Sequence, residues 1–566
     1  MTKLRYWIAV AVALFAALTL LERFVLVELL VRRVSIPLFL ALAEVLAIIA
    51  VGALVRRARP VDLPLDFLLG YPIFGALCFL VGTLKISAWT MVPLVVIGAL
   101  GGAWMASQYG VTAGLGAPAD GKRRSVVAIL CIAVVLACGF VFAQAPPASA
   151  DEVAVHLNVP RTWALEERAI ELPLIARSYF PLGIEAADLP LFTMLGIDGG
   201  VASHFLHLVA AIATTLLIAR RTQSWLATAA IVTTPALALT AGWSLADWPL
   251  AGICVALAVA LESEDSRTSA VATAAGMLTK YTFFPFAVLA YAGALLMKKR
   301  VAWKPLTLAV VAGSLFLIRN LVLTGNPFAP FFGEDAMSLG GSRALYLADY
   351  IFHSSFIDEA LGASLLALCV FATGRIAVLT LLGGLVLFFF APTARVLLPF
   401  FIVPAMTAAQ ALERRVFAII VGVAIVVQTL LAVWFTERHT PFTLLAGSAS
   451  ETAYLTKQRP PYDDIAWINQ TIPRGARTLV LGTNQTYWFT SRTRGGDSAR
   501  ISRYVDLPTP DALYVRLKRD GITHVAVLPA DSGELGPTSQ RMLARVLDLY
   551  ASSMTSRGNV TVFALR

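Results

Sequence analysis

Long apolar stretches alternate with short polar ones over most of this chain. The apolar runs recur as far as about residue 435, and most are close to the ~20 residues that a helix needs to cross a bilayer. The expected spans are 6–27, 36–55, 66–84, 89–107, 125–143, 201–219, 225–242, 248–261, 269–282, 283–297, 305–323, 359–373, 375–391, 395–411 and 416–435. The pattern therefore predicts an all-α polytopic membrane protein with about fifteen transmembrane helices.

One polar interruption, 144–200, is much longer than the others. It opens with the adjacent carboxylates Asp151 and Glu152, continues to His156, and reaches Glu185 after a Phe-Pro pair. Connections between neighbouring helices usually need only a few residues. A long loop that carries acids, a histidine and aromatic residues at a membrane surface is therefore a candidate functional site.

Basic clusters at the ends of the apolar runs predict the orientation of the chain. They are Arg56-Arg57-Ala58-Arg59, Lys122-Arg123-Arg124, Arg220-Arg221, Lys298-Lys299-Arg300 and Glu413-Arg414-Arg415. All fall on one side, which the positive-inside rule makes cytoplasmic, whereas Arg32-Arg33 falls on the other side. The opposite, outer face then holds the 144–200 loop together with 243–247, 324–358, 392–394 and everything after about 436.

Composition supports this class and excludes others. Hydrophobic residues make up 58% and charged residues 14% of the chain, and the mean hydropathy is +0.75, which excludes a soluble protein. The net charge of +10 would suggest nucleic acid as a partner in a soluble chain, but here it marks topology signals and contacts with lipid headgroups. All five cysteines lie inside apolar runs and are interpreted as small core residues.

After about residue 436 the sequence becomes polar and changes its pattern. It predicts an amphipathic helix over Tyr462–Thr471 and buried strands over 478–482, 524–528 and 560–565. A small α/β domain outside the membrane is expected. The predicted division is an N-terminal transmembrane module over 1–120, a catalytic transmembrane domain over 121–435 and a soluble extracytoplasmic domain over 436–566.

Several loop residues are candidates for chemistry. Asp151 directly follows an outward span and is the candidate general base, with a solvated helix-end charge as the alternative. Glu152 and His156 are four residues apart and share a face of a helix, so they could share a proton, hold a metal or bind a sugar. A purely structural histidine is an equal alternative. Glu185 is the candidate that completes the acidic cluster.

Later candidates return to the same face. Asp247 lies between two tryptophans in the second outer loop, and Lys280, next to Tyr281, stands where two short spans meet. Lys280 is a candidate phosphate ligand, with snorkelling to the headgroups as the alternative. Arg395 and Arg319 are further candidates for a lipid phosphate. His204 and His207, one turn apart, are interpreted as packing residues.

Together these residues resemble the GT-C superfamily of integral-membrane glycosyltransferases, in particular the bacterial branch related to protein O-mannosyltransferases and lipid A aminoarabinose transferase. The matching features are Asp151-Glu152, His156-Leu157, Pro160, Phe180-Pro181 through Glu185, Asp247, Gly276 through Tyr281, Arg319-Asn320, Thr324-Gly325-Asn326-Pro327, Arg395 and Leu398-Pro399. They cover roughly 125–435. The spans before the loop depart from the family, in which the catalytic loop usually follows the first span.

The resemblance implies inverting transfer of a sugar from a polyprenyl-phosphate donor, with Asp151 as base, at the outer face of a bacterial plasma membrane. It leaves open a divalent metal, Mg²⁺ or Mn²⁺, for which Glu152 and Asp247 are the candidate ligands. Membrane lipids and an acceptor that is a lipid, glycan or protein are the expected partners. The alternatives are a transporter or flippase of a lipid-linked saccharide, or a non-catalytic envelope scaffold.

Overall fold

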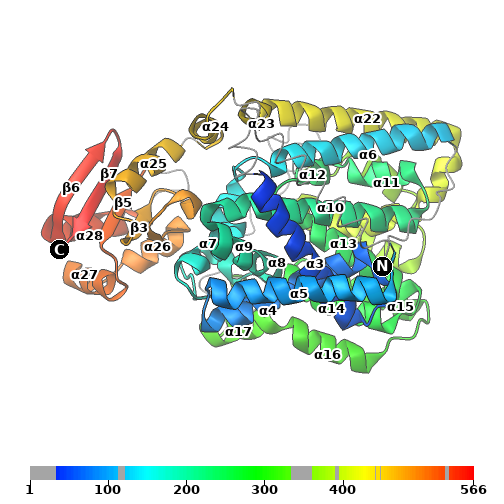
Figure 1. Ribbon diagram of the computed structural model, residues 1–566, viewed down its shortest axis with the longest axis horizontal. Coiled ribbons are helices and arrows are strands. Elements are labelled where there is room, and N and C mark those ends of the chain that lie inside the picture. Colours follow the sequence, from blue (N-terminus) through cyan, green and yellow to red (C-terminus); the bar gives the residue numbers. More distant parts are fainter. Residues whose placement is uncertain are drawn as a thin grey trace.

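The computed structural model describes residues 34–112, 122–332, 360–388, 394–439, 441–445, 448–459, 461–529 and 535–566. Its long helices lie along the longest axis of the molecule, and the C-terminal sheet region extends beyond one set of helix ends (Figure 1). The helices of the long loop lie between these two parts (Figure 1). The predicted combination of a helical membrane protein with a small C-terminal α/β region is confirmed.

Four helices precede the long loop in the described chain. They are α3 (Ile36–Arg56), α4 (Leu63–Leu84), α5 (Ala88–Tyr109) and α6 (Lys122–Ala143), close to four of the expected spans. A short parallel pair, β1 (Val61–Asp62) with β2 (Val111–Thr112), joins the ends of this group. The expected span 6–27, the Arg32-Arg33 pair and the predicted boundary at 120 lie outside the described residues.

The loop itself folds into short helices rather than irregular chain. They are η2 (Glu152–His156, a π-helix), α7 (Asn158–Leu165), η3 (Ala176–Tyr179), α8 (Gly183–Ala187), α9 (Leu189–Leu195) and η4 (Gly196–Asp198). Helix α8 packs against α4 at Gly75, where a Cβ atom would lie 1.6 Å from the carbonyl oxygen of Gly183. Only glycine permits this contact between backbones.

The remaining helices follow the predicted order. They are α10 (Gly199–Thr222), α11 (Trp225–Val232), α12 (Pro235–Ala238), α13 (Asp247–Glu262), α14 (Ser266–Thr279), α15 (Phe283–Leu296), α16 (Trp303–Gly313), α17 (Leu315–Thr324), α19 (Ala363–Cys369), α20 (Arg375–Phe388), α21 (Ala394–Thr407), η6 (Ala409–Glu413) and α22 (Arg415–Arg438). The expected span 225–242 is instead two short helices, because Pro235 has no N–H to continue α11. Expected span 359–373 is only partly helical, as α19.

Among the described residues, six helical segments are long and apolar enough to cross a membrane. A seventh is obtained if α16 and α17, which are bent by 46° relative to each other, count as one span. Several other expected spans are apolar helices of 10–17 residues. The chain is thus a multi-pass membrane protein, while the count of fifteen stays a prediction.

Ion pairs hold residues of two of the predicted basic clusters at helix ends. Arg220 at the end of α10 contacts Asp62 before α4, with Nη1 2.6 Å from Oδ2. The neighbouring Arg221 contacts Glu262 at the end of α13 at 2.7 Å. Arg56 at the end of α3 contacts Asp66 at 2.8 Å. The C-terminal ends of α3, α10 and α13 and the N-terminal end of α4 are therefore held by ion pairs to acids close by, while the membrane orientation stays a prediction.

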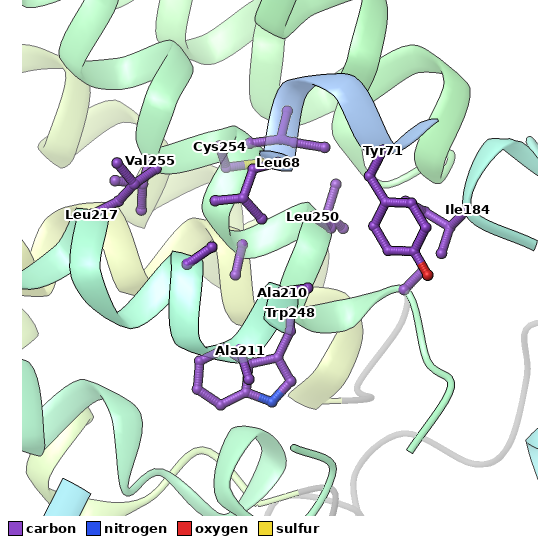
Figure 2. Close-up of a cluster of buried hydrophobic side chains, with 14 of the residues drawn as sticks. Leu68, Tyr71, Ile184, Ala210, Ala211, Leu217, Trp248, Leu250, Cys254 and Val255 are labelled. Carbon is purple, nitrogen blue, oxygen red and sulfur yellow. The ribbon is translucent and has the colours of Figure 1, made fainter. Parts of the chain in front are cut away.

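The core between the helices is formed by buried apolar side chains. Figure 2 shows Leu68 and Tyr71 of α4 among Leu250 and Cys254 of α13, with Trp248 nearby. Each of these side chains is buried, and all five cysteines of the chain are free and buried. The interpretation of the cysteines as core residues is confirmed.

The C-terminal region forms a five-stranded sheet covered by helices. Its elements are α23 (Pro441–Leu445), α24 (Glu451–Gln458), α25 (Tyr462–Thr471), β3 (Arg477–Leu481), η7 (Thr486–Trp488), β4 (Arg492–Arg494), α26 (Ser498–Val505), α27 (Pro510–Arg519), β5 (His524–Val527), α28 (Pro537–Tyr550), β6 (Ala551–Arg557) and β7 (Val560–Leu565). The strand order is β4-β3-β5-β7-β6, with β3 parallel to β4 and β5, and β7 antiparallel to β5 and β6. The predicted helix and three strands are confirmed.

Buried polar contacts join this sheet region to the long loop. Arg161 of α7 donates from Nη2 to the carbonyl oxygen of Phe489 at 2.6 Å, and its guanidinium lies over the ring of Tyr487. Arg477 of β3 contacts Glu166, with Nη2 and Oε2 2.5 Å apart. The C-terminal region therefore rests on the loop and helps to fix its conformation.

Candidate functional site

A continuous chain of ion pairs links the loop to three later helices. Lys280 Nζ lies 2.9 Å from Asp247 Oδ1, and the other oxygen of Asp247 lies 2.9 Å from Arg395 Nε. The same arginine reaches Asp151 Oδ2 through Nη1 at 3.0 Å. Asp151 Oδ1 in turn accepts a 2.7 Å bond from Arg177 Nη1. Three cations thus alternate with two carboxylates.

Helix ends place these charges. Asp247 is the first residue of α13, where the helix dipole favours a negative charge, and Lys280 caps the C-terminus of α14, where it favours a positive one. Arg395 lies in the first turn of α21. The loop supplies Asp151 immediately before η2, and Arg177 within η3. Five separate segments therefore converge on one point.

Exposure distinguishes the two carboxylates. The side chain of Asp151 is 32% exposed, whereas that of Asp247 is completely buried. Arg395 is 10% and Lys280 16% exposed. Asp247 therefore holds the two cations in place from inside, and Asp151 is the carboxylate that is accessible from outside.

The charges around Asp151 keep it ionised. Burial by itself raises the pKa of this carboxyl, but the positive charges of Arg395 and Arg177 outweigh burial and hold its pKa well below the usual range. His156 adds to the same effect. In this state Asp151 is a carboxylate at neutral pH and a weak proton acceptor.

Glu152 and His156 do not contact each other as their spacing suggested. Glu152 is fully buried and accepts hydrogen bonds from the backbone N–H of Ser244 at 2.6 Å and of Ser149 at 3.1 Å, and His204 Nε2 lies 2.9 Å from its Oε1. The π-helix changes the direction of each side chain from that expected in an α-helix. Glu152 therefore fixes the loop against α10, which agrees with the interpretation of His204 as a packing residue.

His156 has a different acidic partner. Its Nδ1 lies 2.6 Å from Oε1 of Glu185 in α8, and the imidazole is 16% exposed. His156 also lies close enough to Asp151 and Asp247 to lower the pKa of Asp151 by its charge. The His156–Glu185 pair therefore borders the ion-pair chain, although it makes no direct bond to it.

Tyr281 and Arg319 form a second group beside the ion-pair chain. The hydroxyl of Tyr281 donates to the carbonyl oxygens of Tyr179 and Ala329, at 3.2 and 2.9 Å. Arg319 Nη1 donates to the carbonyl oxygen of Ser178 at 2.8 Å. Both side chains hold the backbone that follows Arg177, so they position the loop cation and do not join the ion-pair chain.

The residues proposed as metal ligands do not fit a metal ion. The described part of the chain contains no group of three or more His, Cys, Asp or Glu residues arranged to hold one. Both oxygens of Asp247 accept bonds from cationic side chains, and both oxygens of Glu152 are occupied by hydrogen-bond donors. No step is therefore assigned to a metal.

Sequence reasoning missed Arg177. It stands in the loop between apolar residues, in Ile175-Ala176-Arg177-Ser178-Tyr179, where a cation has no role in topology. A lone cation among apolar residues in a long outer loop was the available signal.

Buried acids behind the site were also missed. Asp188 Oδ2 accepts a 2.8 Å bond from Ser203 Oγ, which lies 2.8 Å from Ser244 Oγ. Glu44 in α3 is fully buried, and both of its oxygens lack a hydrogen-bond partner among the described residues. Glu44 lies within an apolar span, so its local sequence resembles that of a plain membrane helix, whereas Asp188 follows Glu185 in the long loop.

Solved structures of two proteins, ArnT and AftD, resemble this chain in part of their backbone arrangement. ArnT from Cupriavidus metallidurans in the apo state is 13% identical with a TM-score of 0.49, covering 77% of this chain and 97% of that one. The same protein bound to undecaprenyl phosphate is 15% identical with a TM-score of 0.48, at the same coverage. Arabinofuranosyltransferase AftD from Mycobacteria is 17% identical with a TM-score of 0.42, covering 80% of this chain and 42% of that one.

ArnT and AftD are GT-C glycosyltransferases, the superfamily that the sequence resembles. No protein-family model and no curated protein sequence matches the chain. At TM-scores below 0.5 these likenesses say nothing about individual residues, whose roles follow from the contacts described above.

Proposed function

We propose that the chain is an inverting glycosyltransferase that moves a sugar from a polyprenyl-phosphate donor to an acceptor hydroxyl. The site faces the outside of a bacterial plasma membrane in this proposal, and about fifteen segments cross or enter the bilayer. The observation that carries it is the ion-pair chain, in which the partly exposed carboxylate of Asp151 is paired with Arg395 and Arg177, and Lys280 is joined to Arg395 through the buried Asp247.

The cations suit the phosphate of the donor. Arg395 and Arg177 present planar guanidinium groups, which match phosphate oxygens in pairs, and Lys280 adds a compact charge. With two carboxylates between them, the three cations leave one positive charge uncompensated. The polyprenyl chain would remain in the bilayer while its phosphate reaches these side chains at the surface.

Asp151 is the acid that receives the acceptor proton in this proposal. The acceptor oxygen attacks the anomeric carbon, the bond from that carbon to the phosphate oxygen breaks, and the hydroxyl proton moves to the Asp151 carboxylate. The electron pair of the broken bond leaves with polyprenyl phosphate. A single displacement of this kind inverts the anomeric carbon, and the cations stabilise the charge on the leaving phosphate.

Donor binding would also activate Asp151. In the described state Arg395 and Arg177 lower the pKa of this carboxyl. A phosphate competes for the same guanidinium groups, which weakens their hold on Asp151 and raises its pKa. The base would therefore become effective only when the donor is in place.

The test compares two acids of equal exposure. Asp151→Asn is expected to reduce transfer from a labelled polyprenyl-phosphate sugar by about 10²–10⁴-fold, the usual contribution of a general base. Glu262→Gln is the matched control, because Glu262 is also 32% exposed and paired with an arginine but lies at the opposite helix ends. Unchanged transfer in Asp151→Asn would refute the assigned base, and movement of the intact donor without sugar release would indicate a transporter.

A further inference from the structure

A second cavity opens on the same side of the molecule as the ion-pair chain. It has a volume of about 360 Å³, within the range of ligand pockets. Its walls come from the turn between α4 and α5, from α7, and from the end of α9 with η4. The cavity is thus shared between the N-terminal helices and the long loop, and it uses none of the residues of the ion-pair chain.

The charges in this cavity favour an anion. Arg161 lines it with a side chain that is 7% exposed, and Lys85 lines it from the turn. Lys85 has no ion-pair partner among the residues that the structure describes, whereas Glu167 adds one carboxylate to the lining. The N-terminus of α5 also faces the cavity through Ser87 and Ala88, and its dipole favours a negative group.

Hydrogen bonds hold the long loop against the turn between α4 and α5 at the edge of the cavity. The backbone N–H of Ile86 donates to the carbonyl oxygen of Glu167 at 2.7 Å, and that of Ala169 to Gly82 at 2.8 Å. Arg168 Nε donates to the carbonyl oxygen of Thr83 at 2.7 Å. Because α4 ends at Leu84 and α5 begins at Ala88, this turn joins the ends of two helices that are long and apolar enough to cross a membrane.

Apolar side chains beside the cavity suit the rest of an amphiphile. Leu84 and Trp89 flank the turn and are 81% and 91% exposed. A tryptophan at the end of an apolar helix is typical of the interface between headgroups and acyl chains. Cationic groups in the cavity and exposed apolar groups next to it match a phosphate headgroup joined to acyl chains.

We propose that this cavity binds the phosphate-bearing headgroup of an anionic membrane lipid. Lys85, Arg161 and the first turn of α5 hold the phosphate, and the acyl chains lie against Leu84 and Trp89. The site gives the N-terminal helices a role, because a bound lipid connects their outer turn to the loop that carries Asp151. Lipid binding here is independent of the proposed transfer reaction.

The test measures phosphatidylglycerol bound to the full-length protein in phosphatidylcholine nanodiscs. Lys85→Glu is expected to weaken binding at least tenfold, because it removes one charge-assisted contact and adds a repulsive charge. Lys304→Glu, at an exposed position near the start of α16, is the matched control and is expected to leave binding unchanged. Asp151→Asn is also expected to bind phosphatidylglycerol normally.

Equal binding by the Lys85→Glu variant and the native chain would overturn the proposal. Displacement of the lipid by soluble glycerol phosphate at the same concentration would also overturn it, because the cavity would then recognise a free phosphate ester. Arg161 is not chosen for substitution, since it also supports the C-terminal region through Phe489.

Discussion

Replacing Arg395 with methionine should destabilise the protein as well as inactivate it. Methionine keeps much of the length of the side chain but removes the hydrogen bonds of 2.9 Å to Asp247 and 3.0 Å to Asp151. The two carboxylates then lose their shared cation. Because Asp247 is buried and Asp151 is partly exposed, the two broken ion pairs are expected to lower the free energy of unfolding by different amounts.

The larger loss is at Asp247. Breaking a buried pair by removing one partner costs about 3–5 kcal/mol, because the remaining charge is left buried. Asp247 is fully buried but keeps Lys280 at 2.9 Å, so the lower end, about 3 kcal/mol, is expected. Asp151 is 32% exposed and keeps Arg177, so its lost pair adds only about 0–1 kcal/mol.

Equilibrium unfolding in detergent micelles measures the free energy of unfolding of three variants relative to the native chain. The free energy of unfolding is expected to fall by about 3 kcal/mol in Arg395→Met and by less than about 1 kcal/mol in Asp151→Asn. The double variant Arg395→Met/Asp247→Asn is expected to lose less than the sum of its single variants, because the buried charge that Arg395→Met leaves behind is removed.

Two results would refute this reasoning. If Arg395→Met were as stable as the native chain, the ion-pair chain would not be formed in the protein. If Asp151→Asn lost as much stability as Arg395→Met, Asp151 would be a structural acid, and its assignment as the accessible base would be wrong.

Two further predictions concern pH and packing. Arg177→Gln removes one of the charges that lower the pKa of Asp151, so the acid limb of kcat/KM, which requires the ionised carboxylate, is expected to move to higher pH in a pH–rate profile; an unshifted limb would show that Arg177 does not act on Asp151. Gly75→Ala places a methyl group 1.6 Å from a backbone oxygen of α8 and is expected to cost about 1–3 kcal/mol or more in thermal unfolding. Gly101→Ala, in open space on α5, is the control, and equal stability of the two variants would contradict the close contact.

The apolar pattern predicted most of the helices because it is a local property. Helix α10 (Gly199–Thr222) and strand β7 (Val560–Leu565) agree closely with the runs 201–219 and 560–565. Strand β6 (Ala551–Arg557) was missed, since it is an exposed edge strand of small polar residues with no apolar alternation. The expected span 225–242 was wrong as a single helix because Pro235 disfavours a helical residue before it and so divides the segment.

Candidate residues were found in the same way, as polar groups in an apolar chain, but their partners were not. The spacing of Glu152 and His156 suggested a pair, and the π-helix gave each a different partner. Arg177 lacked a recognisable motif, and its position opposite Asp151 depends on how η3 is held by Arg319.

The sequence by itself predicted a multi-pass helical membrane protein with a small C-terminal α/β region. It also identified Asp151, Asp247, Lys280 and Arg395 as charged groups in an otherwise apolar chain. Only the tertiary structure decided that Arg395 bridges Asp151 and Asp247, across separations of 244 and 148 residues. The apolar residues on either side of an ionisable group in the sequence indicate that its charge is in an unfavourable environment. The group that compensates the charge is chosen by helix packing, which brings distant ends together and leaves no local signal.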